Sequence, residues 1–308
     1  MQSFKEALDD LLTDLAWSLW TELGVAGVER RHARHSVDPE SLIIFTADLG
    51  DTDPRLRDES MDWCIRYDSF ISEVRLRNLL KTQDEVTKKA FGEYAATINA
   101  NGSARWPVPS GSAPFSFTPS GKSVVDFSRP AVLRLRMRAL FGVGARAELL
   151  TAFLGEPAAS RSASELTVVG YAKRNIAQVL SELHSAGLLQ ARPIQNRIHY
   201  RLARVDALRA LAEPLPDFFL DWSMLLTFAA AARHLAMRPM DTSWRVSAVA
   251  VNQLLMHFET TLASFDEPVP KSQPSTRDYW ENASDWILRF FRGLSSERTP
   301  SSARSTSP

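Results

Sequence analysis

The chain has 308 residues, of which 44% are apolar and 23% are charged, values that are ordinary for a globular protein of two or three domains. Its 36 lysine and arginine residues balance 36 aspartate and glutamate residues, which excludes a uniformly basic protein that attracts nucleic acid through its overall charge. The single cysteine, Cys64, excludes an internal disulfide and a cluster of metal-binding thiolates, and favours a cytoplasmic location. The longest apolar stretch, between Asp221 and Arg233, falls short of the roughly 20 residues that a membrane-spanning helix needs, so no membrane contact is expected.

The first hundred residues are predicted to form an all-helical domain. Apolar residues recur at helical spacing along residues 3–23. Pro39 and Pro54 each follow an aspartate and stand where the first turn of a helix accepts proline. Two further helical segments are expected at about residues 71–81 and 84–98.

The composition changes at residues 101–128, which are rich in proline, serine and glycine. No apolar period persists there, so we interpret this stretch as a linker. Trp106 and two phenylalanines can hold it against a neighbouring domain. A separate domain is expected over residues 129–213, beginning with a helix that opens at Pro130.

The stretch from residue 162 to 202 indicates a short helix, a tight turn, a longer helix and a β-hairpin. Ser162 and Glu165 are spaced as in a capping box, and Gly170 interrupts the helical pattern after them. Gly187 stands where the longer helix needs a left-handed cap, and two strand-like runs follow it. The apolar face of the longer helix contains Ile176, Val179, Leu180 and Leu183.

This order resembles the winged helix-turn-helix module of small bacterial transcriptional regulators, in particular the ArsR-like and MarR-like groups. The resemblance rests on Gly170, on the helix at residues 173–185, on Ala186-Gly187-Leu188-Leu189 after it and on Tyr200-Arg201-Leu202 closing the hairpin. It covers about a quarter of the chain. It implies a mainly α fold, in which a central winged helix with a small β-hairpin wing is flanked by N- and C-terminal helical regions. It also implies double-stranded DNA as the partner.

Basic residues are concentrated in the same part of the chain. Between residues 129 and 204, twelve lysines and arginines stand against four glutamates, a local charge of +8 that leaves −8 for the rest. This segregation favours a DNA contact, because neutralisation of phosphates supplies much of the affinity of DNA-binding modules. The alternative is that some of these arginines pair with acidic flanking helices.

The longer helix is expected to place its first turns in the major groove. Lys173, Arg174 and Gln178 project away from its apolar face and carry the donors and acceptors that base edges require, while Asn175 lies nearer the flank. The hairpin is expected to contact phosphates or the minor groove. The predicted DNA-binding residues are Arg161, Tyr171, Lys173, Arg174, Asn175, Gln178, Arg192, Arg197 and His199.

Residues 214–294 are predicted to form a second helical region, and the serine-rich tail at residues 295–308 is expected to be disordered. Two segments, residues 220–232 and 246–258, are apolar on most sides and are expected to be buried in a bundle core or a dimer interface. A homodimer is favoured because winged-helix regulators commonly read two half-sites. We expect the two flanking regions to pack together for dimerisation or effector sensing.

The sequence contains no enzyme signature. Gly142-Val143-Gly144 lacks the third glycine and the preceding strand of a dinucleotide site, and no Gly-x-Ser-x-Gly elbow occurs. His32 and His35 are three apart, but no further ligands follow at a recognisable spacing, so we expect no metal. The prediction is therefore a DNA-binding transcriptional regulator that is not an enzyme and needs no cofactor. The alternative is a protein-interaction module, such as an antitoxin or an adaptor, that binds a partner protein through its helical regions.

Overall fold

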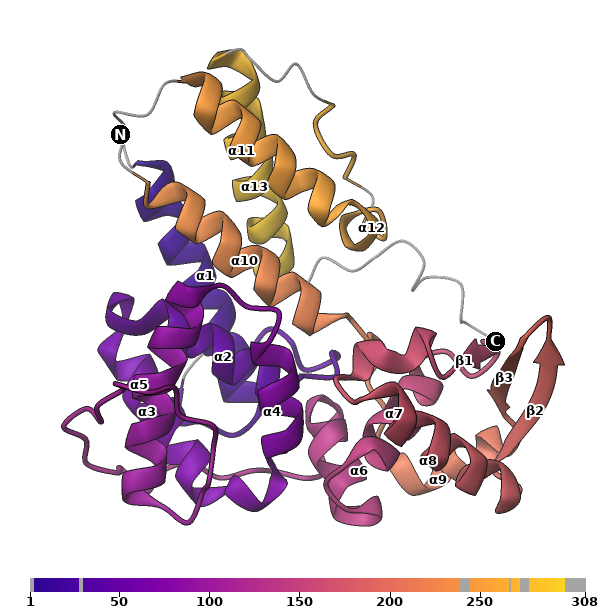
Figure 1. Cartoon of the computed structure of the whole chain (residues 1–308). Coiled ribbons are helices and arrows are strands. Elements are labelled where there is room, and N and C mark those ends of the chain that lie inside the picture. Colours follow the sequence, from indigo (N-terminus) through magenta and orange to yellow (C-terminus); the bar gives the residue numbers. More distant parts are fainter. Residues whose placement is uncertain (1–2, 28–29, 239–243, 266, 272–276, 297–308) are drawn as a thin grey trace.

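The computed structural model describes residues 3–27, 30–238, 244–265, 267–271 and 277–296. The predicted disordered tail therefore lies almost entirely outside the described residues. The described part is mainly helical, with one small antiparallel sheet, and it contains two hydrophobic cores (Figure 1). We call the two bodies built around these cores the larger unit and the central unit.

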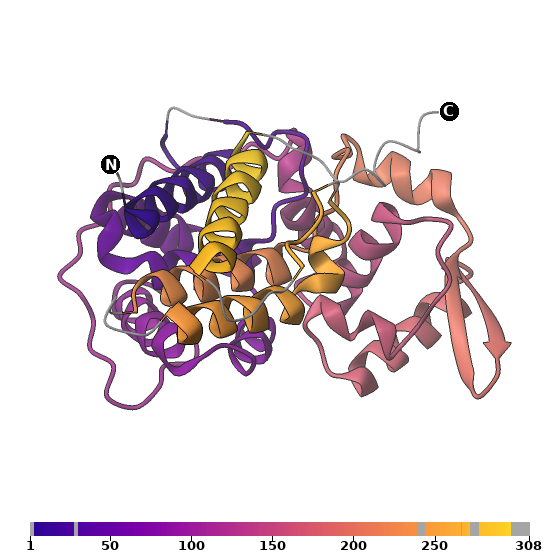
Figure 2. The same ribbon diagram turned by 90° about the horizontal axis from the view of Figure 1, so that it is seen from above.

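The larger unit combines helices from both ends of the chain. Helix α1 packs along α13, and α2 lies against both α5 and α10, so the two flanking regions share one core, in agreement with the expectation that they pack together (Figures 1 and 2). The helices from the first hundred residues are α1 (Phe4–Glu22), α2 (Pro39–Leu49), α3 (Pro54–Arg66), α4 (Glu73–Leu80) and α5 (Glu85–Asn101). Those from the C-terminal part are α10 (Trp222–Ala236), α11 (Trp244–His257), α12 (Glu259–Leu262) and α13 (Arg277–Ser295).

Local signals explain where these helices begin. Most of them start at a serine or aspartate whose side chain accepts a hydrogen bond from a backbone N–H of the first turn, which satisfies a donor that the helix itself leaves unpaired. Pro39 and Pro54 occupy the first helical position, as predicted. The capping residues are Ser3, Asp38, Asp53, Ser72, Asp84 and Asp221.

Residues 102–128 contain no helix or strand, in agreement with the linker interpretation, but they pack against the larger unit. Trp106 is buried, stacks on Phe91 with ring centroids 6.3 Å apart, and donates from Nε1 to Asp68 Oδ1 at 3.1 Å. The N–H of Val124 donates to Gly24 O at 2.8 Å. The segment is thus a covering of the larger unit as well as a connection.

The central unit follows the predicted order of elements. In its sheet the strand order is β1-β3-β2, and every pair is antiparallel. Its helices and strands are the 3₁₀ helix η3 (Pro130–Val132), α6 (Leu133–Phe141), α7 (Ala145–Gly155), β1 (Arg161–Ser162), the 3₁₀ helix η4 (Glu165–Val169), α8 (Lys173–Ser185), β2 (Leu189–Ile194), β3 (Arg197–Leu202) and α9 (Val205–Ala212). From α6 on, the helices and strands pack around their own core, while Ala131 and Val132 of η3 belong to the core of the larger unit.

The turns of the central unit form where the sequence places them. Ser162 N donates to Glu165 Oε2 at 2.7 Å at the start of η4, which is a 3₁₀ helix where a short α-helix was expected. Gly170 has φ +87° at the end of η4 and Gly187 has φ +72° after α8, a backbone region that glycine adopts without strain. Gln195 has φ +52° in the two-residue loop of the hairpin.

A buried cluster of charges joins the two units. Arg75 of α4 donates through both terminal nitrogens to the two oxygens of Asp38, each at 2.5 Å, and also to Glu40 Oε2 at 2.7 Å. Arg138 of α6 donates to both oxygens of Glu40, at 2.7 and 2.8 Å, and to Glu148 Oε1 of α7 at 2.6 Å. All five side chains are at most 2% exposed.

A sixth member, Arg134, completes the buried charge cluster by contacting Glu148 and lying 3.9 Å from Asp38 Oδ2. Three arginines thus face three carboxylates. Burial alone would raise the pKa of Asp38, but the charges of Arg75 and Arg134 outweigh it and hold that pKa well below its usual range. Asp38 is therefore ionised at neutral pH.

We predict that Arg138→Met lowers the free energy of unfolding by about 3–5 kcal/mol, because Glu40 and Glu148 would lose a buried partner. The control is Arg146→Met, which breaks a pair with Glu182 in which both side chains are nearly half exposed, and which should lose no more than about 1 kcal/mol. Denaturant titration of both variants measures the difference. Equal losses would show that the buried cluster contributes no more than a surface ion pair.

Candidate nucleic-acid interface

Helix α8 has one buried and one exposed face. Ile176, Leu180 and Leu183 point into the core of the central unit, while Val179 is half-buried. The opposite face is exposed and carries Arg174, Asn175 and Gln178. Lys173, three positions before Ile176, is also exposed because it stands at the first position of the helix. The structure therefore exposes four of the nine predicted DNA-binding residues in the first two turns of one helix.

The first turn of α8 is unusual for a helix start. Ala172 stands at the N-cap and supplies no capping side chain, and the first turn contains Lys173 and Arg174 but no acidic residue. Cations at this end oppose the helix dipole, which favours negative charge there. The first turn therefore combines unpaired N–H groups with two cations, an arrangement suited to an external anion rather than to the stability of the helix itself.

The hairpin carries a second basic face. Arg192 is paired with His199, and Ile194 with Arg197, while Tyr200 and Leu202 alternate with them and point into the core. Arg192 and Arg197 therefore share the outer face with His199. Arg201, which the sequence analysis did not select, joins the same face by its position in β3.

Arg161 does not belong to this outer face. It is paired with Tyr200 in the register of β1 and β3, which places it on the opposite side of the sheet from His199. Its guanidinium lies 2.5 Å from Glu156 Oε2. The structure thus separates Arg161 from the other basic residues of the hairpin.

Tyr171 was predicted to bind DNA, but its side chain is not accessible to a duplex. Its side chain is buried between the two units, where its hydroxyl lies 2.7 Å from Ser72 Oγ. Burial raises the pKa of Tyr171 to about 12. The residue attaches the turn before α8 to α4, a role that the sequence could not indicate because Ser72 is 99 positions away.

The local charge of +8 overstates the basic surface. Arg129 contacts Glu22, Arg134 and Arg138 belong to the buried charge cluster, and Arg136 donates to carbonyl oxygens, including that of Ala212 at 3.0 Å. The alternative interpretation, pairing with acidic residues of the flanking helices, is therefore right for Arg129, Arg134 and Arg138, whereas Arg136 contacts backbone carbonyls only. Arg146 and Arg161 also pair with glutamates. Of the twelve basic residues between positions 129 and 204, those that are exposed and have no carboxylate partner in the described structure are Lys173, Arg174, Arg192, Arg197, Arg201 and Arg204.

One acidic residue remains on the exposed side of α8. Glu182 accepts from Gln178 Nε2 at 3.1 Å and from Arg146 Nη2 at 2.7 Å. It lies two turns or more from Lys173 and Arg174, towards the C-terminal end of the helix. The free cations are thus concentrated at the start of α8 and on the hairpin.

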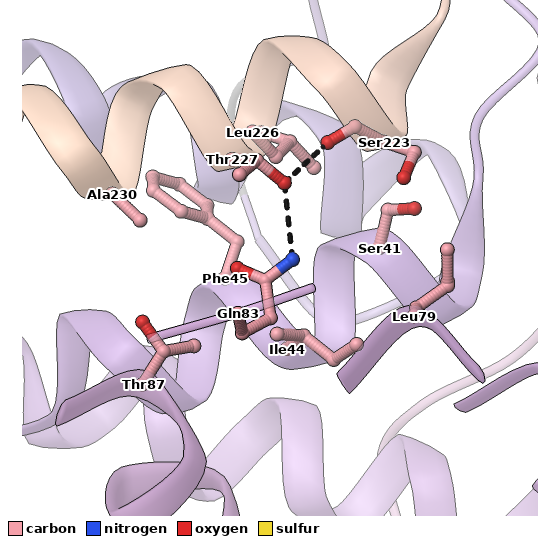
Figure 3. A pocket seen from close by; sticks show the side chains of 10 residues that line it. All are labelled: Ser41, Ile44, Phe45, Leu79, Gln83, Thr87, Ser223, Leu226, Thr227 and Ala230. Atoms are coloured by element: carbon pink, nitrogen blue, oxygen red, sulfur yellow. Dashed lines mark hydrogen bonds between the residues drawn. The ribbon is translucent and has the colours of Figure 1, made fainter. Parts of the chain in front are cut away.

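A small hollow between α2, α4, α5 and α10 does not provide a ligand site. Gln83 Nε2 donates to Thr227 Oγ1 at 3.1 Å across it, and Thr227 donates in turn to Ser223 O at 2.7 Å (Figure 3). The enclosed space is about 10 Å³, which is room for one water molecule. Gln83 and Thr227 bond to each other across it, whereas the buried hydroxyl of Ser41 has no hydrogen-bond partner in the described structure. The lining residues pack α10 onto the rest of the larger unit.

The histidine pair near the start of the chain is internal. His32 Nδ1 lies 2.7 Å from Ser18 Oγ and its Nε2 lies 2.9 Å from Leu294 O, while His35 packs against Phe218 and Trp222. Within the described ranges, no group of three or more histidine, cysteine, aspartate or glutamate side chains is placed to hold a metal ion. The two histidines therefore act as core residues of the larger unit.

The comparisons with known proteins identify no family for this chain. No family model matches the chain, and neither a curated protein nor a solved structure does. In the part of the chain that the structure describes, no helix has the length and apolar character needed to cross a membrane.

Burial lowers the pKa of His32 to about 4 and that of His35 to about 3, whereas the ordinary value is 6.5. The unfolded chain therefore binds more protons below pH 6.5, and each histidine makes the fold less stable as the pH falls. We predict that His35→Phe, which removes no hydrogen bond within the described structure, reduces the slope of unfolding free energy between pH 6.5 and 4 by up to about 1.4 kcal/mol per pH unit.

The control for this slope is His234→Gln. Hydrogen bonds to Asp48 and Asp84 raise the pKa of His234, so its stabilisation is fully present below pH 6.5 and disappears as the pH rises through its folded pKa. This variant should lose stability mainly at low pH. Denaturant titrations across the pH range test both signs, and an unchanged slope in His35→Phe would contradict the assignment of a neutral buried imidazole.

Proposed function

We propose that the chain is a DNA-binding transcriptional regulator whose central unit is a winged helix-turn-helix. The succession of a helix, a short strand, a short helix, a longer helix and a hairpin, with strand order β1-β3-β2, supports this assignment. The observation that carries the proposal is the exposed surface of α8. In the described structure Lys173, Arg174 and Asn175 have no carboxylate partner there, and Gln178 contacts only Glu182 of the same helix.

In this proposal α8 enters the major groove and reads base edges. Arg174 is suited to guanine, and Asn175 and Gln178 to adenine, because each can offer two hydrogen bonds in the geometry of those bases. Lys173 and the N–H groups of the first turn take phosphates. The outer face of the hairpin, with Arg192, Arg197 and His199, follows the backbone or the minor groove and positions α8.

A second candidate function, protein interaction, is favoured by α11. Val246, Val249 and Met256 are 50%, 43% and 65% exposed and recur along one side of the helix, opposite the buried Ala248 and Leu255. Residues 246–258 were expected to be buried in a bundle core or a dimer interface, and in the single chain this side of the helix is not part of a bundle core. Such a stripe suits a protein partner, and a second copy of the chain, giving the predicted homodimer, is one such partner.

We predict that Arg174→Ala loses roughly 1–3 kcal/mol of binding energy for a preferred duplex, obtained by selection from a random pool, and little for a scrambled one. The matched control is Arg204→Ala, an exposed arginine between the hairpin and α9. Titration of both duplexes decides the role. An equal loss on both would make Arg174 a phosphate contact, and no loss on either would exclude α8 from the interface.

The hairpin should behave differently from α8. We predict that Arg197→Ala weakens binding to all duplexes similarly and lowers the slope of log affinity against log salt by about one unit, as expected when one phosphate contact is lost. Affinities measured at several salt concentrations test this. An unchanged slope with an altered base preference would assign Arg197 to base recognition.

A further inference from the structure

Helix α4 of the larger unit lies directly against the turn that begins α8. Arg75 Nε donates to Val169 O at 2.8 Å, and Asn78 Nδ2 donates to Gly170 O at 3.1 Å. A Cβ atom on Gly170 would lie 2.9 Å from Cγ of Arg75, which is too close for an ordinary contact. The turn before α8 therefore lies so close to α4 that only glycine fits at position 170 without a shift of Arg75. These contacts fix α4 beside Ala172, the residue that precedes α8.

Two cations lie near the C-terminal end of α4. Arg77 and Lys81 are four positions apart, which places them on the same side of a helix, and both are exposed. Lys81 Nζ donates to the neutral side chain of Asn78 at 2.9 Å. Neither cation has a carboxylate partner in the described part of the chain.

The surface between Lys81 and α8 is open. Lys81 lines a groove of about 380 Å³ together with Ala172. It also lines a second groove, of about 430 Å³, together with Arg77 and Lys88, and no residue of the central unit lines that one. Asp221 also lines the first groove, where its Oδ1 caps α10 by accepting from a backbone N–H. Lys173 follows Ala172 directly, so the first groove connects Lys81 with the start of α8, and Arg77 lies beyond Lys81.

We propose that Arg77 and Lys81 form a second phosphate-binding arm, which contacts the backbone of the same duplex whose major groove α8 enters. The inference rests on the proposed DNA-binding function and extends it to the larger unit. Charge complementarity selects this occupant, since Lys81 shares a groove with the start of α8, whose proposed ligand is a polyanion, and Arg77 extends the positive charge from Lys81 along α4. The contacts of Arg75 and Asn78 hold the arm in place, so little ordering accompanies binding.

A cation at the C-terminal end of a helix also interacts favourably with the helix dipole, and Lys81 is the C-cap of α4. That purely structural role would change the stability of the fold and leave the affinity for DNA unchanged. Measurement of both quantities in the same variants therefore separates the two roles.

The experiment compares full-length variants by fluorescence anisotropy on a short labelled duplex of mixed sequence, at several salt concentrations. The double variant Arg77→Gln with Lys81→Gln removes the arm. Its control, Lys89→Gln with Lys122→Gln, removes two exposed lysines that line neither groove and leaves the same net charge. A third double variant, Lys173→Gln with Arg174→Gln, tests the proposed function itself.

Each phosphate contact contributes roughly 8-fold to affinity at about 0.1 M salt and about 0.9 to the salt slope. Loss of the arm should therefore weaken binding by roughly 10- to 60-fold and lower the slope by about 1.8, with an unchanged thermal midpoint and no such effect in the control. If the Lys173 and Arg174 variant loses affinity while the arm variant matches the control, the arm is refuted and the proposed function stands. If the wild-type chain does not bind the duplex at all, the proposed function fails as well.

Discussion

The arrangement of this protein depends on one buried cluster of charges. Arg75 and Arg138 bridge Asp38, Glu40 and Glu148, and with Arg134 they leave no net charge. Removal of a single ion from water costs several kcal/mol, and the cost is offset only when every partner is in place. The carboxylates of α2 and α7 and the guanidiniums of α4 and α6 therefore stabilise the fold only as a set.

This requirement determines how the central unit sits on the larger one. Apolar surfaces can slide past one another at little cost, whereas the paired hydrogen bonds between Arg75 and Asp38 fix both distance and angle. The same arginine donates to Val169, immediately before the turn into α8, and Tyr171 contacts Ser72. The position of the exposed face of α8 is thus set by residues of the larger unit, about a hundred positions earlier in the chain.

The elements of the central unit could be predicted because their signals are local. Gly170 and Gly187 stand where the backbone adopts positive φ, and the apolar period of α8 matches its buried face. The exposure of Arg174 and Gln178 follows from the same period. Each of these features is determined within a few residues, which a sequence displays directly.

The roles of Arg134 and Arg138 could not be predicted in the same way. A count of charges does not distinguish an arginine on the surface from one that pairs with an acidic residue far away, and Glu40 precedes Arg138 by 98 positions. The two ends of the chain were expected to pack together, but which helices contact one another could not be predicted, because apolar periodicity shows that a helix is buried but not against which partner. Tyr171 was selected for its place before α8, although its neighbour in space decides its role.

Because the buried charge cluster stabilises the fold only as a set, we infer that the two units unfold as one body. All eight tryptophans lie outside residues 129–213, so their fluorescence reports on the larger unit alone. Hydrogen exchange of peptides from residues 173–202, measured across the same denaturant series, reports on α8 and the hairpin. We expect the two probes to give the same midpoint. Loss of protection in residues 173–202 at a clearly lower denaturant concentration than the fluorescence change would contradict the account.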